Sequence, residues 1–360
     1  MKSRFLSIIG VMLVLALTLS LVGCGQKTID VSSEPVSSEK PEPVYYNPLT
    51  GLPIDKAALD KRPVALMINN ISVAQPVQTG LNDADIVYEL YAEGGITRLL
   101  AVFKDISKVG QIGTIRSARY SHIDLAVGHD AIYVHAGKND SHAAPHMKEL
   151  GLDIFDLGAR NYGFRERNGK AYEHTLYTSG KKLIEGFEKY DFRLELKKES
   201  SNWQTFVSAD QPVVPNEGTC EEISVKMSAS YITKFKYDAT TGRYTRYSGS
   251  TERKDYKTGK AITFKNVLVL KTTTKATGNK SGIVLTGLEG GEGYYLSNGG
   301  YQTVKWSKGS ASSPLKITLA DGSDCPYNVG NTWVCLVDKK NSVKITPAEV
   351  ASSATATTSK

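Results

Sequence analysis

The segment Gly113–Arg119 contains the residue types best suited to binding an anion. Its sequence, GTIRSAR, places Arg116 and Arg119 three residues apart, where a short apolar run ends and helical spacing begins near Ser117. Helix N-termini offer free N–H groups, and guanidinium groups match pairs of phosphate oxygens. We therefore expect Arg116, Ser117 and Arg119 to form an anion site, with both arginines on one face of a helix.

Arg98 would add a third cation to this site. It stands in an apolar, strand-like run that follows Gly94–Gly95, where an arginine needs a partner, and Glu89 or Glu93 across the predicted hairpin would provide one. Structural ion pairs are the alternative to an anion site. In that interpretation the arginines are neutralised by nearby carboxylates, for which the candidates are Asp83, Asp85, Glu89 and Asp124.

Histidines form a second candidate group. His135 ends an apolar run, at a position where functional groups often emerge from α/β sheets, and His174 opens a Leu-Tyr-Thr motif. We expect His135 and His174 to line a ligand site with Arg116; ordinary hydrogen-bonded histidines are the alternative. His142 and His146 have the i, i+4 spacing of metal chelators, but no glutamate between them could act as a base. We therefore predict neither a metal site nor a cofactor.

Three short motifs resemble those of penicillin-interacting enzymes but fail on context. Ser179-Gly-Lys-Lys182, Ser200-Ser-Asn202 and Lys257-Thr258-Gly259 occur in the expected order. However, the first two are too close for a helical domain to intervene, and the third stands in a charged turn. Chance occurrence explains them better, and we assign no catalytic residue.

Elements of both kinds must position these residues in the first half of the chain. Two β-type runs flank Gly94–Gly95 and predict a hairpin, and apolar runs at 63–68 and 131–134 predict buried strands. Helical spacing covers 117–127, 142–150 and 180–190. This mixture predicts a mixed α/β sheet over residues 45–203.

The second half has a different character. Short alternating runs separated by Gly, Asn and Asp clusters continue from 204 to 346 without a helix signal. This pattern predicts an all-β domain, sandwich or barrel-like, so the fold class of the whole chain is α+β.

The N-terminus predicts a lipid anchor. Lys2 and Arg4 precede an apolar run that ends in Leu-Val-Gly-Cys24, which looks like a bacterial lipobox. We expect residues 1–23 to be a lipoprotein signal peptide, Cys24 to be acylated, and the protein to lie on the extracytoplasmic face of the cell membrane. An uncleaved membrane anchor is the alternative. Residues 24–44 are a Ser/Glu/Pro-rich linker and 347–360 a low-complexity tail.

The net charge limits the kinds of partner that the protein can bind, and the number of cysteines limits its disulfide bonds. The formal net charge is +7, and loss of Lys2 and Arg4 with the signal peptide leaves a modest excess that suits anionic envelope polymers or lipid head groups. No basic run points to nucleic acid. Of the four cysteines, Cys325 and Cys335 could pair across a hairpin or stay free, and with Cys220 their number is odd, so at least one thiol is unpaired.

Five motifs in the same order resemble the YerB-like lipoproteins of Gram-positive bacteria, over nearly the whole mature chain. The motifs are Asn47-Pro-Leu-Thr-Gly-Leu52, Ala84-Asp-Ile-Val-Tyr-Glu89, Glu93-Gly-Gly-Ile-Thr-Arg98, Ile115-Arg-Ser-Ala-Arg119 and His174-Thr-Leu-Tyr-Thr178. The resemblance implies no biochemical function, because none is settled for that family.

Together these observations predict a membrane-tethered binding or scaffold module for an anionic envelope ligand or a protein partner. The alternative is an envelope enzyme that acts on a phosphate or pyrophosphate through an arginine-lined cleft. That alternative rests on analogy with LytR-CpsA-Psr phosphotransferases, which clamp a lipid pyrophosphate with arginines. Exposed arginines would favour the enzyme, and arginines buried against carboxylates would favour the scaffold.

Overall fold

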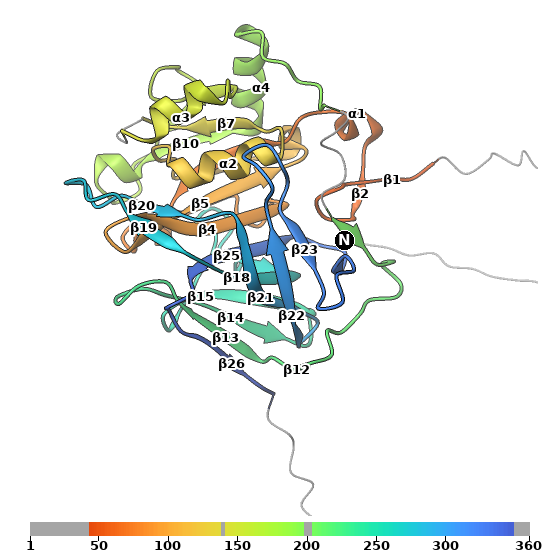
Figure 1. The fold of residues 1–360 in the computed structure, drawn as a ribbon. Coiled ribbons are helices and arrows are strands. Elements are labelled where there is room, and N and C mark those ends of the chain that lie inside the picture. Colours follow the sequence, from red (N-terminus) through yellow and green to blue (C-terminus); the bar gives the residue numbers. More distant parts are fainter. Residues whose placement is uncertain (1–42, 138–140, 198–203, 349–360) are drawn as a thin grey trace, which may run out of the picture. The chain divides into compact units, whose positions relative to one another are not determined.

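The computed structural model describes residues 43–137, 141–197 and 204–348 (Figure 1). The chain from Val44 onward forms one compact unit. The predicted signal peptide, Cys24, nearly all of the linker and most of the C-terminal tail lie outside the described residues. No helix in the described part is long and apolar enough to cross a membrane.

An eleven-stranded mixed sheet runs through both halves of the sequence. Its order is β12-β22-β21-β18-β25-β4-β5-β3-β7-β8, with β23 beside β22. Strand β25, close to the C-terminus, lies parallel to both β18 and β4 and so joins the two halves. The strands are β3 (Val64–Asn69), β4 (Ile86–Glu93), β5 (Ile96–Phe103), β7 (Ile132–His135), β8 (Ile154–Asp156), β12 (Gly218–Thr219), β18 (Asn266–Thr272), β21 (Gly290–Ser297), β22 (Gly300–Ser307), β23 (Lys316–Thr318) and β25 (Thr332–Asp338).

The central hairpin of this sheet has the turn chemistry that the sequence predicts. Strands β4 and β5 pair antiparallel around Gly94 and Gly95, whose φ angles are 55° and 79°. Glycine adopts such positive φ values without steric cost. Strand β3 is buried at all six positions, as its continuous apolar run requires.

A six-stranded antiparallel sheet covers part of the second half, and its inward side chains share one hydrophobic core with the larger sheet. Phe235 and Phe264 from the smaller sheet pack against Trp333 of β25, with ring centroids 5.6 and 5.1 Å apart. Its strands are β13 (Glu222–Lys226), β14 (Ile232–Asp238), β15 (Arg243–Ser248), β16 (Thr251–Glu252), β17 (Thr263–Phe264) and β26 (Val343–Thr346).

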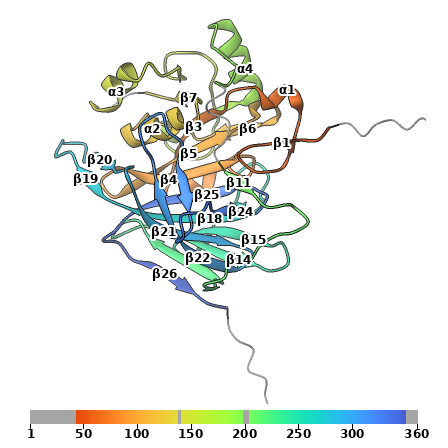
Figure 2. The same ribbon diagram turned by 45° about the vertical axis from the view of Figure 1, so that its right-hand side comes forward.

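The helices gather at the end of the molecule away from this smaller sheet (Figures 1 and 2). They are α1 (Lys56–Leu59), α2 (Tyr120–Gly128), α3 (Ala143–Glu149) and α4 (Gly180–Lys189), with 3₁₀ turns η1 (Gln75–Val77), η2 (Ile106–Lys108) and η3 (Tyr172–His174). Small sheets complete the fold: β1 (Tyr45–Tyr46) with β2 (Pro53–Ile54), β6 (Gln111–Gly113) with β10 (Leu176–Ser179) and β9 (Phe164–Arg165), β11 (Thr205–Phe206) with β24 (Pro326–Tyr327), and β19 (Thr274–Ala276) with β20 (Val284–Thr286).

The predicted fold class is confirmed: a mixed α/β N-terminal region with helices precedes a β-rich C-terminal region. The parallel pairing of β25 with β4 was not predicted, because pairing between strands so distant in sequence leaves no local pattern. The boundary between the domains near residue 203 stays a prediction, and the shared sheet favours a single cooperative unit.

The three cysteines of the folded region are free and buried. The disulfide between Cys325 and Cys335 that we left open does not form. Burial raises the pKa of the Cys220 and Cys325 thiols to about 12, so both are poor nucleophiles at neutral pH.

Candidate functional site

The predicted anion-binding segment lies across the carboxyl ends of two parallel strands, β3 and β7. The Arg116 amide donates to the Met67 carbonyl of β3, and the Ala136 amide, just after β7, donates to the Arg116 carbonyl. The Ala118 amide donates to the Gly137 carbonyl. The ends of parallel strands are the usual ligand positions of α/β sheets, so the location agrees with the expectation.

The predicted helix start near Ser117 is wrong. Helix α2 begins at Tyr120, and its N-cap Arg119 is extended, with φ −140° and ψ 144°. The backbone from Ile115 to Ala118 is bonded to neighbouring segments and is therefore not available for helical hydrogen bonds. Arg116 and Arg119 consequently do not share a helical face.

Glu93 bridges two of the three arginines. Its Oε1 accepts from Arg98 Nη2 at 2.7 Å and its Oε2 from Arg119 Nε at 2.6 Å. Arg98 also donates to the Ser117 carbonyl, and Arg119 to the Ala118 carbonyl. Both arginines are buried, so here the ion-pair interpretation holds. We call Glu93, Arg98, Arg116 and Arg119 the arginine cluster.

The electrostatics of the cluster show an excess of positive charge. Burial lowers the pKa of Arg98 to about 9, and the neighbouring charges of Arg119 and Arg116 add to that effect. Burial alone would raise the pKa of the Glu93 carboxyl, but the hydrogen bond from Arg119 and the charge of Arg98 lower it overall. Glu93 thus faces three guanidinium groups, and a second carboxylate, that of Glu173, acts on Arg116.

Arg116 is the member of the cluster with spare donors. Its side chain is half-buried and makes a long hydrogen bond, 3.3 Å from Nη1 to the Glu173 carbonyl oxygen. The Nε atom is buried without a partner among the described residues. Burial lowers the pKa of Arg116, whereas the Glu173 and Glu93 charges oppose that shift.

The two predicted histidines lie on either side of this segment. His174, in η3, approaches Asn69 with 2.8 Å between Nδ1 and Nδ2, and its Nε2 lies 3.9 Å from Glu173 Oε1. Burial lowers the pKa of His174, and the charge of Arg116 acts in the same direction. His135 is fully buried at the end of β7, with Nδ1 3.1 Å from the Gly137 carbonyl oxygen.

Several carboxylates that we considered as partners of the arginines form hydrogen bonds with other residues instead. Asp85 accepts from the Lys104 amide and from Asn47, and Asp124 lies 2.6 Å from His146 Nε2. Glu89 accepts hydrogen bonds from a set of buried polar side chains beside β14. Within the described ranges, no group of three or more His, Cys, Asp or Glu is placed to hold a metal ion.

The charged turn with the Lys257-Thr-Gly sequence has a structural role. Asp255 accepts from the Thr79 hydroxyl at 3.1 Å, from the Gly80 amide at 2.7 Å and from the Thr258 amide at 2.9 Å. Lys257 pairs with Glu166 at 2.5 Å. The turn thus connects the C-terminal region to the N-terminal region through hydrogen bonds and an ion pair.

Two residues near the arginine cluster escaped the sequence analysis. Asn69 ends β3 and contacts His174, and Glu173 faces both His174 and Arg116. The polar pair Asn69–Asn70, directly after a continuous apolar run, was a usable signal for a site at the strand end. Nothing local marked Glu173, which reaches Arg116 only through the fold.

Comparison with known proteins agrees with this description. Residues 49–193 match the family described as "Protein of unknown function (DUF3048) N-terminal domain", and residues 223–334 match the corresponding C-terminal domain. The "Putative lipoprotein YerB" of Bacillus subtilis (strain 168) is 27% identical over 336 residues, which are 91% of this chain and 95% of that protein. A crystal structure of the YerB protein from Bacillus subtilis matches with a TM-score of 0.70 at 27% identity, over 83% of this chain and 99% of that one. With both domains matched in order and the fold shared, the chain belongs to the DUF3048 family, to which the YerB-like proteins are related by sequence and structure.

Proposed function

We propose that this protein is a membrane-tethered extracytoplasmic lipoprotein that works as a binding or scaffold module, and that Arg116 contacts an anionic ligand of the envelope or an acidic partner. The observation that carries the proposal is the imbalance of charge around Glu93. Arg98 and Arg119 each bind one oxygen of that carboxylate, whereas Arg116, half-buried beside them, makes a long hydrogen bond to the Glu173 carbonyl and leaves its Nε without a partner among the described residues. A phosphate or carboxylate group would supply the missing acceptor.

The other predicted residues take supporting positions in this proposal. Arg98 and Arg119 provide a fixed positive field from buried positions, because their guanidinium groups are already bound to Glu93. Ser117 and His174 lie beside Arg116 and would shape the contact, whereas His135 is fully buried and would act only by positioning the backbone through its contact with the Gly137 carbonyl. The ligand is bound on a face built around buried ion pairs, which by the criterion set from the sequence favours a scaffold over an enzyme.

The lipid anchor at Cys24 is part of the proposal, supported by the lipobox-like sequence and by the name of the Bacillus subtilis relative. Cys24→Ala should move the protein out of the membrane fraction or leave it with its signal peptide uncleaved and unlipidated. Metabolic labelling with a fatty-acid analogue, followed by fractionation, measures both. A variant that is still labelled and fractionates like the wild type would refute the anchor at this residue.

The anion site is tested by thermal unfolding of the soluble mature domain in chloride, phosphate and pyrophosphate at equal ionic strength. Phosphate or pyrophosphate should raise the Tm of the wild type above its value in chloride, because a ligand that binds only the folded state stabilises it. Arg116→Gln should abolish that rise while changing the free energy of unfolding by less than about 1 kcal/mol, because Arg116 is only half-buried and its hydrogen bond to the Glu173 carbonyl is long.

Lys344→Gln is the matched control. Lys344 is exposed on β26 of the six-stranded sheet, so the substitution removes the same charge from a site remote in the fold. This variant should keep the full phosphate response. Equal responses of both variants would show that net charge, not the arginine cluster, attracts the anion. Release of phosphate from pyrophosphate in these samples, if lost in Arg116→Gln, would favour the enzyme.

A further inference from the structure

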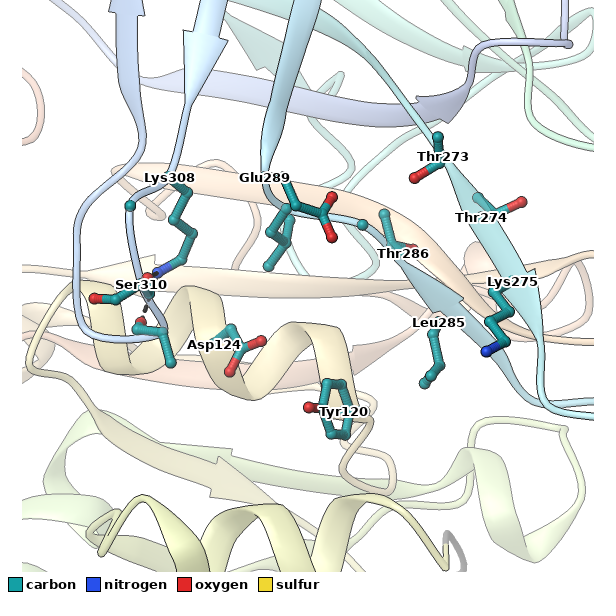
Figure 3. A pocket seen from close by; sticks show the side chains of 14 residues that line it. Tyr120, Asp124, Thr273, Thr274, Lys275, Leu285, Thr286, Glu289, Lys308 and Ser310 are labelled. Carbon is teal, nitrogen blue, oxygen red and sulfur yellow. Dashed lines mark hydrogen bonds between the residues drawn. The ribbon is translucent and has the colours of Figure 1, made fainter.

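A cavity of about 700 Å³ lies between helix α2 and two segments of the C-terminal region, away from Arg116. Figure 3 shows Tyr120 and Asp124 on α2, with Glu289 and the β19–β20 hairpin opposite and the loop around Lys308 and Ser310 at one end. Pockets where separate chain regions meet are common ligand sites. Of the residues just named, the sequence suggested a role only for Asp124, as a candidate ion-pair partner of the arginines.

One wall of the cavity is an aromatic ring held beside a carboxylate. Tyr120 and Asp124 are four residues apart on α2 and therefore lie on one face of it. The Tyr120 ring stacks on the His146 imidazole, with centroids 3.9 Å apart and planes at 15°. The same imidazole lies 2.6 Å from Asp124 Oδ1 through its Nε2. His146 thus fixes the ring and the carboxylate together.

The remaining walls are also held in place by the protein. Lys308, buried, donates to the Ser310 and Ser313 carbonyls at 2.6 Å each and to the Ala311 carbonyl at 2.5 Å. On the other side, the Ser121 hydroxyl of α2 bonds to both the carbonyl and the amide of Thr286. Because these bonds define the walls without a ligand, binding would need little reorganisation.

The chemistry of the lining suits a polyhydroxylated ligand. Tyr120 offers an aromatic surface for the C–H face of a sugar ring, and Leu285 and Leu288 add apolar contact. Asp124 and Glu289 provide carboxylate acceptors for neighbouring hydroxyls, while Lys275 and Thr273 provide donors. The lining holds two carboxylates, Asp124 and Glu289, beside two lysines, Lys275 and Lys308, so it lacks the excess of positive charge that surrounds Glu93.

We propose that this cavity binds an oligosaccharide, with Tyr120 as the stacking residue and Asp124 as a hydroxyl acceptor. This second site is independent of the anion contact at Arg116 and of its charge. The protein would then bind a neutral or amino-substituted glycan chain in this cavity and an anion at Arg116.

Isothermal titration of the folded mature domain with two probes tests the proposal: a tetramer of N-acetylglucosamine and a tetramer of β-1,4-linked glucose. At least one should bind, and Tyr120→Ala should weaken that binding at least tenfold, while Tyr120→Phe keeps it within about threefold because the ring remains. Tyr172→Ala is the matched control, since Tyr172 is a 71% exposed tyrosine outside the cavity. It should bind like the wild type.

The two sites give separable results. Arg116→Gln should leave oligosaccharide binding unchanged, and Tyr120→Ala should leave the phosphate response unchanged. Circular dichroism of each variant establishes that it is folded. If neither tetramer binds the wild type, or if folded Tyr120→Ala binds as well as the wild type, the oligosaccharide site is refuted whatever the outcome at Arg116.

Discussion

Two groups of polar residues in this protein, each with buried arginine, differ in how the positive charge is neutralised. In the arginine cluster, Glu93 serves two guanidinium groups and a third stays nearby with spare donors. The second group lies between the two sheets, where Arg246 of β15 and Glu89 of β4 are both fully buried. We call Arg246, Glu89, Asn70, Tyr231 and Thr233 the inter-sheet network.

The members of the inter-sheet network mostly satisfy one another. Arg246 Nη2 donates to Asn70 Oδ1 at 2.9 Å and to the Tyr231 hydroxyl at 3.0 Å, and its guanidinium lies 4.6 Å from the centre of the Trp333 ring. Glu89 accepts from Asn70 at 2.9 Å and from Thr233 at 3.0 Å. One positive and one negative charge are thus joined through neutral polar groups in a dry interior.

This difference distinguishes buried polar residues that stabilise the fold from polar residues that can bind a ligand. An enclosed network fixes how two sheets meet and lies out of reach of a ligand, even though the buried Arg246 Nε has no hydrogen-bond partner among the described residues. A cluster with more cations than anions, at the carboxyl ends of parallel strands and partly open, can gain from an external anion. Successive residues connect the two, since Asn69 contacts His174 and Asn70 contacts both Glu89 and Arg246.

The largest effect should come from breaking the inter-sheet network. Arg246→Met keeps much of the side-chain volume but removes the hydrogen bonds that Arg246 donates to Asn70 and Tyr231. It also leaves the Glu89 carboxylate without the positive charge of Arg246. Breaking such a buried charged network should lower the free energy of unfolding by about 3–5 kcal/mol, measured by urea denaturation. Lys236→Met, on neighbouring β14 with a half-exposed side chain, should cost less than about 1 kcal/mol. Similar small losses in both variants would contradict the structural role of the network.

Removing the shared carboxylate should have an intermediate effect. Glu93→Gln leaves Arg98 and Arg119 without their counter-charge, but the Glu93 side chain is 21% exposed, so water can replace part of the lost interaction. We expect a loss of about 2–3 kcal/mol. Phosphate should recover part of it, giving this variant a larger rise in Tm than the wild type, because the unbalanced guanidinium groups then bind the anion more tightly.

Glu222→Gln is a matched control for this change. Glu222 is also 21% exposed and also lies between two cations, Lys234 at 3.1 Å and Lys236 at 3.5 Å. Because the Lys234 and Lys236 side chains are 27% and 51% exposed, far more than those of Arg98 and Arg119, its loss should cost less than about 1 kcal/mol and bring no extra phosphate response. If phosphate restored neither or both variants to the same degree, the special position of Glu93 would be disproved.

Local sequence patterns predicted the elements better than their assembly. The glycine pair at 94–95 and the continuous apolar run before Asn69 predicted the correct strands. Turn formation and strand burial depend on residues that are neighbours in the sequence. The helix start near Ser117 failed because backbone partners from β3 and from the segment after β7 keep residues 115–118 extended. Such partners are distant in sequence and leave no periodic signal there.

The candidate site was predicted in composition but not in geometry. Arg98 needed a carboxylate, and Glu93 was one of two named candidates. The other, Glu89, points from the same strand into the inter-sheet network, a difference that depends on where β14 and β15 pack. The cavity proposed to bind an oligosaccharide was not predicted, since its residues come from 120–124, 273–289 and 308–311 and meet only in the fold.

The effect that is smallest at pH 7 should appear as a pH dependence on the arginine side of the comparison. His122 of α2 is fully buried, with Nε2 3.2 Å from the Arg98 carbonyl oxygen. Burial lowers the pKa of His122 from 6.5 to about 3; the hydrogen bond to Arg98 opposes this shift, and the charges of Arg98 and Arg119 increase it. The folded protein therefore holds this imidazole neutral at pH values where the unfolded chain protonates it.

The sign of the effect follows from the excess of protons bound by the unfolded state. Stability contributed by His122 is complete above pH 6.5 and falls as the pH drops toward 3, by at most about 1.4 kcal/mol per pH unit. His122→Gln can still donate to the Arg98 carbonyl but cannot be protonated. Its free energy of unfolding, measured in urea at pH 7, 6, 5 and 4, should decline less steeply than that of the wild type. His142→Gln, at the half-buried N-cap of α3, should keep the wild-type slope, because that side chain lies outside the buried arginine environment. Parallel curves for His122→Gln and the wild type would contradict the lowered pKa of His122, and with it the combined action of burial and the neighbouring guanidinium charges on this imidazole.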